Sequence, residues 1–204
     1  KRQVVACNPR GSTGRGLSHA RAVVGDGWGV VDVEDVTNVM EDALRRDPRL
    51  DADRLGVMGG SYGGFLTAWL IAKDHRYKSA VVERALLSFT SFAGTSDIGG
   101  MFPKIYAGVD LVDGPEVLWE KSPLSIAHQI ETPTLILHSE NDFRCPIEQA
   151  EQLFMILKRQ GVDTELLRFP GEGHELSRSG KPKHRQERFE AIIEWHDRRL
   201  TDNA

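Results

Sequence analysis

The sequence lacks the features that define several classes of protein. Its 204 residues include only two cysteines, Cys7 and Cys145, which are too few for a disulfide framework and lack the spacing of a metal site. So few cysteines favour a reducing compartment, and we expect the protein to be cytoplasmic. No apolar run approaches the roughly 20 residues that cross a bilayer, so we expect no membrane partner.

Excess charge of one sign is also lacking. The chain has 26 Lys and Arg residues against 30 Asp and Glu, a net charge of −4, which gives no electrostatic reason to bind nucleic acid. The Gly-rich residues 10–16 match neither a P-loop nor the G-x-G-x-x-G fingerprint. No cluster of histidine, cysteine and carboxylate side chains has metal-ligand spacing. We therefore expect neither a cofactor nor a metal.

Apolar segments with strand and helix patterns alternate along the chain. Strands are expected at residues 4–7, 55–58, 80–82, 134–138 and 164–169, and helices at 33–46, 65–72, 148–159 and 185–200. This alternation predicts an α/β fold with a mostly parallel, doubly wound sheet. Residues 86–128 lack clean periodicity and are too long for a plain connection, so we interpret them as an insertion of short helices that covers a site.

Residues 59–64, Gly-Gly-Ser-Tyr-Gly-Gly, stand between a strand pattern and a helical pattern. In that context a G-x-S-x-G motif forms a nucleophile elbow, where small neighbours leave room for a strained turn. The sequence therefore predicts that Ser61 is a nucleophile. The backbone N–H of Tyr62, the next residue, is expected to stabilise an oxyanion. The alternative is a Gly-rich loop, such as a phosphate cradle, that holds a serine by chance.

A serine nucleophile needs a base, and the base needs an orienting carboxylate. In α/β-hydrolases the acid and the histidine follow the serine, each at the carboxyl end of a later strand. Asp142 and His174 have this order and placement, so we predict a Ser61, Asp142, His174 triad. Glu140 is a rival acid, but it lies nearer the strand end and is less suited to reach the histidine. The alternatives are that Asp142 is a turn or helix-cap residue and His174 a solvated loop residue.

Four segments resemble the catalytic domain of the prolyl oligopeptidase family of serine peptidases, in the family's order. They are residues 8–14, 59–64, 94–99 and 171–174. Residues 138–146 look most like the acylaminoacyl-peptidase branch. The resemblance implies an α/β-hydrolase fold and an enzyme that cleaves short peptides and releases N-acylated amino acids or short N-terminal fragments. It also implies that Arg144 binds a substrate carbonyl oxygen, the alternative being a surface arginine or a salt-bridge partner.

Three parts of the family's catalytic protein are not found in this sequence. They are the His-Gly-Gly-Pro type segment with the second oxyanion donor, the first strands of the hydrolase fold, and the β-propeller that gates substrate entry. We interpret residues 1–204 as the C-terminal part of a catalytic domain and expect the upstream part of the same polypeptide to be its partner. Without the intervening strand, the strands at 4–7 and 55–58 would be separated by a slot with unpaired backbone groups. Direct pairing of these two strands would contradict this expectation.

The insertion is expected to supply the wall of a substrate pocket. The candidates are Met101, Phe102 and Tyr106, with Phe89, Phe92 and Ile105 as further apolar residues; ordinary core packing is the alternative for each. The function that we expect is a serine peptidase acting on short peptides. Its rivals are a carboxylesterase or lipase with the same triad and a catalytically silent hydrolase fold that only binds ligands. The sequence leaves open whether the protein forms a homo-oligomer.

Overall fold

The computed structural model describes residues 3–201, which contain a four-stranded parallel sheet. The strands are neighbours in chain order, β1-β2-β3-β4. Their bounds are Leu55–Gly60 for β1, Tyr77–Glu83 for β2, Thr134–Ser139 for β3 and Thr164–Phe169 for β4. Because the strands are parallel, their carboxyl ends meet at one edge of the sheet. The predicted α/β class with a parallel sheet is confirmed.

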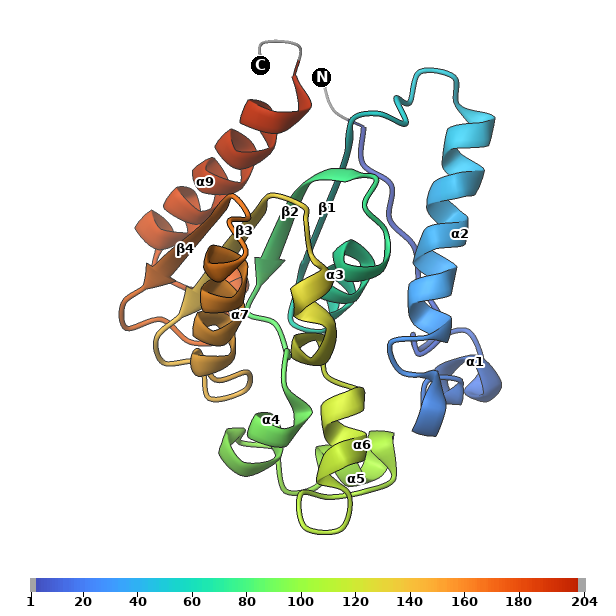
Figure 1. The fold of residues 1–204 in the computed structure, drawn as a ribbon, viewed down its shortest axis with the longest axis vertical. Coiled ribbons are helices and arrows are strands. Elements are labelled where there is room, and N and C mark those ends of the chain that lie inside the picture. The colour runs from blue at the N-terminus through green and yellow to red at the C-terminus, as the bar shows by residue number, and fades with distance from the viewer. Residues whose placement is uncertain (1–2, 202–204) are drawn as a thin grey trace.

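Helices cover both faces of the sheet (Figure 1). The longer ones are α2 (Val31–Arg46), α3 (Tyr62–Lys73), α7 (Glu148–Arg159) and α9 (Pro182–Leu200). Side chains alternate along β2, where Ala80 and Val82 belong to the core shared with α3 and α7, while Val81 belongs to a second core under α9. This period of two is expected of a strand that is buried on both faces.

Short helices gather at the edge of the sheet where the strands end (Figure 1). Within residues 86–128 the chain forms α4 (Phe89–Thr95), α5 (Phe102–Ala107), α6 (Pro115–Glu120) and the start of the 3₁₀ helix η2 (Pro123–Gln129). The remaining short ones are α1 (Leu17–Arg21), η1 (Gly25–Gly27) and α8 (Leu176–Ser179). The prediction of short helices in this stretch is confirmed.

The predicted buried strand at residues 4–7 is wrong. This segment has no strand assignment, and its valines are exposed, Val4 at 90% and Val5 at 50%. Apolar β-branched residues form a strand only where a neighbouring strand supplies hydrogen bonds and a packing surface. No strand of the described residues takes that place, because β1 lies at the edge of the sheet.

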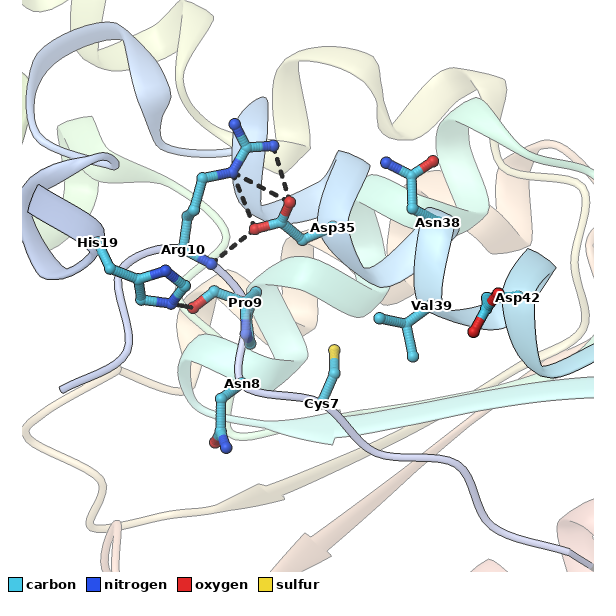
Figure 2. A pocket seen from close by; sticks show the side chains of 9 residues that line it. All are labelled: Cys7, Asn8, Pro9, Arg10, His19, Asp35, Asn38, Val39 and Asp42. Carbon is cyan, nitrogen blue, oxygen red and sulfur yellow. Dashed lines mark hydrogen bonds and ion pairs between the residues drawn. The ribbon is translucent and has the colours of Figure 1, made fainter. Parts of the chain in front are cut away.

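Residues 7–10 lie opposite α2 instead. They line one side of a cavity of about 430 Å³ whose other side is formed by α2 (Figure 2). Arg10 anchors the segment, since its backbone N–H and its Nε donate to Asp35 of α2 at 2.7 and 2.9 Å. Within the described residues, residues 4–7 do not pair directly with β1. The expectation of an intervening strand is therefore not contradicted. The expectation of an upstream partner segment stays a prediction.

The large indole of Trp195 fixes α9 on the sheet, so its loss should destabilise the fold. Trp195 is fully buried, at 0% exposure, with Val81 and Leu137 in the second core. We expect Trp195→Ala to lower the free energy of unfolding by about 3–5 kcal/mol, because transfer and cavity costs add. Phe189→Ala on the same helix is the control, since Phe189 is 60% exposed and surface changes cost about 0.5 kcal/mol or less. Denaturant unfolding of the intact protein measures both, and equal losses would contradict this role.

Candidate active site

Ser61 occupies a strained turn between β1 and α3. Its backbone has φ 61° and ψ −119°, a conformation that non-glycine residues rarely adopt. The neighbouring glycines make the turn possible, because a Cβ on Gly59 would lie 2.2 Å from the carbonyl oxygen of Gly63. A Cβ on Gly64 would lie 2.7 Å from the carbonyl oxygen of Glu83. The stretch has the geometry that the elbow motif requires.

The structure brings together Ser61, Asp142 and His174, as the sequence predicts. His174 Nε2 lies 2.9 Å from Ser61 Oγ, and its Nδ1 lies 2.8 and 3.0 Å from the carboxylate oxygens of Asp142. Each residue follows a different strand of the parallel sheet, which places them at the shared carboxyl edge. The Asp142 side chain is fully buried and that of His174 is 12% exposed. This arrangement can transfer a proton from the serine to the histidine.

Hydrogen bonds fix the carboxylate of Asp142 in one orientation. Its Oδ1 accepts from the backbone N–H groups of Arg144 and Cys145 at 3.0 and 2.9 Å. The buried His138 lies 3.5 Å from Oδ2, but its Nε2–H donates to the carbonyl of Cys145 at 2.7 Å. Burial lowers the pKa of His138, so its ring stays neutral and Asp142 is left to stabilise positive charge on His174. The rival acid Glu140 pairs with Arg168 instead.

Tyr62 has a backbone N–H suited to an oxyanion. As the first residue of α3, its N–H has no acceptor one turn earlier within the helix, and it directly follows Ser61. Its side chain is fixed elsewhere, because the hydroxyl donates to the fully buried Asp32. Burial, reinforced by Asp32, raises the pKa of Tyr62 above its usual range, so the hydroxyl remains a donor.

An aromatic cavity of about 270 Å³ opens beside Ser61. Of the predicted substrate-binding residues, Phe102, Tyr106 and Arg144 line it, as does Phe92. Phe102 and Tyr106 are four residues apart and therefore share one face of α5. Met101, which precedes the helix, is 62% exposed and is not among the lining residues. Ile105, which is 50% exposed, and Phe89, which is buried in the core, do not line the cavity either.

Trp28 is a cavity residue that the sequence analysis did not select. Its ring centroid lies 4.8–5.8 Å from five other aromatic rings, those of Tyr62, Phe65, Phe89, Phe102 and Tyr106. It therefore joins the elbow, the insertion and the N-terminal region in one wall. The available signal was a large aromatic residue between two glycines in a stretch without periodicity.

Arg144 lies at the rim of the cavity and is held by Asp97 of the insertion. Its Nε and Nη2 donate to the Asp97 carboxylate at 2.7 and 3.1 Å. Ser96 Oγ also donates to the carbonyl of Arg144 at 2.7 Å. The salt-bridge alternative is therefore realised in this structure, while a role in binding substrate carbonyl oxygen stays a prediction.

Among residues 3–201, no group of three or more histidine, cysteine and carboxylate side chains could hold a metal ion. Within the same residues, no helix combines the length and the apolar character needed to cross a membrane.

Related sequences align with nearly the whole chain. The profile of the prolyl oligopeptidase family matches residues 3–203. The chain is 49% identical over 197 residues to a Bacillus subtilis protein named uncharacterized peptidase YuxL, and 34% identical over 182 residues to the acylamino-acid-releasing enzyme of Sus scrofa. These alignments cover 97% and 85% of this chain but only 30% and 24% of the relatives. The chain thus spans less than a third of the length of these curated relatives.

Solved structures agree with the sequence matches. Pyrococcus horikoshii acylaminoacyl peptidase superposes with a TM-score of 0.92 at 32% identity, covering 97% of this chain and 32% of that one. A puromycin-hydrolyzing peptidase of Mycobacterium tuberculosis has a TM-score of 0.84 at 30% identity, covering 95% and 29%. The predicted α/β-hydrolase fold and the resemblance to the acylaminoacyl-peptidase branch are confirmed.

The hydrogen bonds around Asp142 predict how an amide would behave there. Since Oδ1 accepts two backbone N–H groups, the amide oxygen of Asp142→Asn should replace it and turn the NH₂ group toward His174. That donor favours the tautomer with the proton on Nε2, which cannot accept from Ser61. We expect a fluorophosphonate to label Ser61 about 10⁴-fold more slowly. Glu140→Gln is the control and should label at close to the wild-type rate; equal losses would favour Glu140 as the acid.

Proposed function

Because the chain belongs to the prolyl oligopeptidase family, we propose that it carries the catalytic residues of a serine peptidase, namely Ser61, Asp142 and His174. The observation that supports this assignment is the continuous hydrogen-bonded path from Ser61 Oγ through both ring nitrogens of His174 to Asp142. A histidine held in this way has its proton on Nδ1 and an unprotonated Nε2 that can accept the proton of Ser61.

In the proposed mechanism, His174 takes the proton from Ser61 as Oγ attacks the substrate carbonyl carbon. The negative charge that develops on the carbonyl oxygen is stabilised by the N–H of Tyr62 and by the positive end of α3. His174 then gives its proton to the leaving amine, which leaves an acyl-enzyme. Water, activated by the same histidine, releases the acyl group. Asp142 stabilises the imidazolium throughout.

For the substrate we propose short peptides, cleaved so that an N-acylated amino acid or a short N-terminal fragment is released. Relatives named acylamino-acid-releasing enzyme support this class. A similar solved structure, with a TM-score of 0.92, is an acylaminoacyl peptidase in complex with Z-Gly-Gly-Phe-chloromethyl ketone. In this chain the cavity beside Ser61 is lined by Trp28, Phe65 and Phe102, which suits a large apolar side chain next to the scissile bond.

Arg144 is proposed to bind a substrate carbonyl oxygen at the rim of this cavity. Its side chain is 43% exposed, so a guanidinium N–H can reach a bound peptide while the contact with Asp97 persists. The upstream part of the polypeptide is proposed to complete the site and to supply the second oxyanion donor. We also propose that the protein acts in the cytoplasm.

The nucleophile is tested by Ser61→Ala in the intact protein. We expect turnover of an N-acetyl amino acid anilide to fall by about 10⁶-fold, because the residue that forms the acyl-enzyme is lost. Binding of the same compound, measured by calorimetry, should be nearly unchanged, since Ser61 is only a small part of the cavity wall. Retained turnover would overturn the assignment of the nucleophile.

The reaction type is tested by comparing two substrates with the same acyl group, an anilide and a p-nitrophenyl ester. A peptidase must protonate an amine leaving group, so we expect the intact protein to cleave both compounds. Cleavage of the ester alone would favour a carboxylesterase. Failure to react with a fluorophosphonate would favour a binding protein without catalysis.

A further inference from the structure

Arg84 reaches the triad from the end of β2. Its backbone has φ 39°, one of two positive values among the non-glycine residues that the structure describes, the other belonging to Ser61. The Arg84 N–H donates to the carbonyl of Leu137 on β3 at 2.8 Å, which fixes this conformation between two central strands. The side chain is only 9% exposed. A long buried cation is thereby directed toward the carboxyl edge of the sheet, where the triad lies.

The guanidinium of Arg84 contacts the same histidine nitrogen as the nucleophile. Its Nη1 lies 3.1 Å from His174 Nε2, and its Nη2 lies 3.4 Å from Ser177 Oγ. The closest carboxylate is that of Glu83, 4.0 Å from Nε, which already accepts two hydrogen bonds from Arg188. The Nε group is buried without a hydrogen-bond partner. The charge of Arg84 is therefore not neutralised by a directly bonded carboxylate.

This contact requires one protonation state of the ring. A guanidinium has only donors, so Nε2 of His174 must be the acceptor and carry no proton. The ring proton is then on Nδ1, where it is donated to Asp142. In the imidazolium both ring nitrogens carry protons, so the contact with Arg84 is lost and two cations face each other. Arg84 therefore favours the neutral ring in the tautomer that can accept a proton from Ser61.

We propose that Arg84 is a positioning residue that keeps His174 unprotonated and so extends the activity of the enzyme to lower pH. This proposal rests on the proposed function, since it concerns the base of the triad. When Ser61 gives its proton to Nε2, Arg84 keeps its own protons and its Nη1–H loses its acceptor. Transfer of the proton from Nε2 to the leaving amine restores the acceptor of Arg84, which favours that step.

Several charged and titratable groups face His174, from different elements of the fold. They are Asp142, His138, Asp97, Glu175 and Arg84. Asp142 favours the imidazolium, and Arg84 opposes it. The carboxylates of Asp97 and Glu175 are themselves paired with Arg144 and Arg178. Within this set, Arg84 is the cation that touches the ring.

The test separates charge from hydrogen bonding in three variants of the intact protein. Arg84→Lys keeps the charge, Arg84→Gln keeps an N–H donor without the charge, and Arg84→Met keeps only an apolar stem. We expect the acid limb of the pH profile of kcat/KM to move up by about one pH unit in the Gln and Met variants. The Lys variant should stay closest to wild type. The rate of fluorophosphonate labelling should shift in the same way, because it depends on the same base.

A purely structural role of Arg84 predicts a different result. In that case kcat/KM falls at every pH, and the acid limb of the pH profile keeps its position. An unmoved acid limb in Arg84→Gln would therefore overturn the proposal, whether or not the plateau falls. Arg76→Gln is the matched control for the loss of one positive charge, since Arg76 pairs with Glu41 and Asp74. Its profile should superimpose on that of wild type.

Wild-type protein supplies a test that does not depend on the folding of variants. With ¹⁵N-labelled histidine, the Nε2 resonance of His174 at neutral pH should show an unprotonated acceptor and Nδ1 a bound proton. A proton on Nε2 would overturn the proposal. Failure of the proposed function is distinguishable, because it would appear as wild-type protein without turnover or labelling, or as activity retained in Ser61→Ala.

Discussion

The candidate active site depends on the close approach of backbone segments around Ser61. Gly59 lies against the carbonyl of Gly63, and Gly64 lies against the carbonyl of Glu83, at distances that leave no room for a Cβ. The backbone N–H of Ser61 then donates to that same carbonyl of Glu83 at 2.9 Å. The turn is therefore held to β2 as well as to its own strand. The direction of the serine side chain and the place of the Tyr62 N–H at the start of α3 both follow from this contact.

A second set of contacts links the cavity beside Ser61 to the carboxylate of Asp142. Arg144 belongs to the loop whose backbone N–H groups hold Asp142, while its side chain pairs with Asp97 of the insertion. The backbone N–H of Asp97 also donates to the carbonyl of Phe143 at 2.8 Å. The insertion thus serves as a wall of the cavity and as a brace for the carboxylate. A shift of the insertion would change both the space in the cavity and the orientation of His174.

The sequence was sufficient to predict that Ser61, Asp142 and His174 lie together, because their positions obey a rule of topology. Ser61, Asp142 and His174 each follow a parallel strand, and such strand ends must meet. The strand expected at residues 4–7 failed because a strand depends on a neighbour, which a local apolar pattern does not reveal. Arg84 was missed because its contact with His174 spans 90 residues and arises from an unusual backbone angle. The lining of the cavity was predicted in part. Phe102 and Tyr106 share one face of α5 and line the cavity, whereas Met101 precedes the helix and does not. Where this helix starts could not be inferred from the sequence.

Gly60 has a role that the elbow motif does not require of it. It occupies the variable position before the nucleophile, and a Cβ there would lie 3.2–3.3 Å from the Nη2, Cζ and Nε atoms of Arg84. The absence of a side chain at residue 60 thus allows the guanidinium to lie flat against the elbow and reach His174. The reach of the guanidinium to His174 therefore depends on the residue at position 60 as well as on the arginine itself.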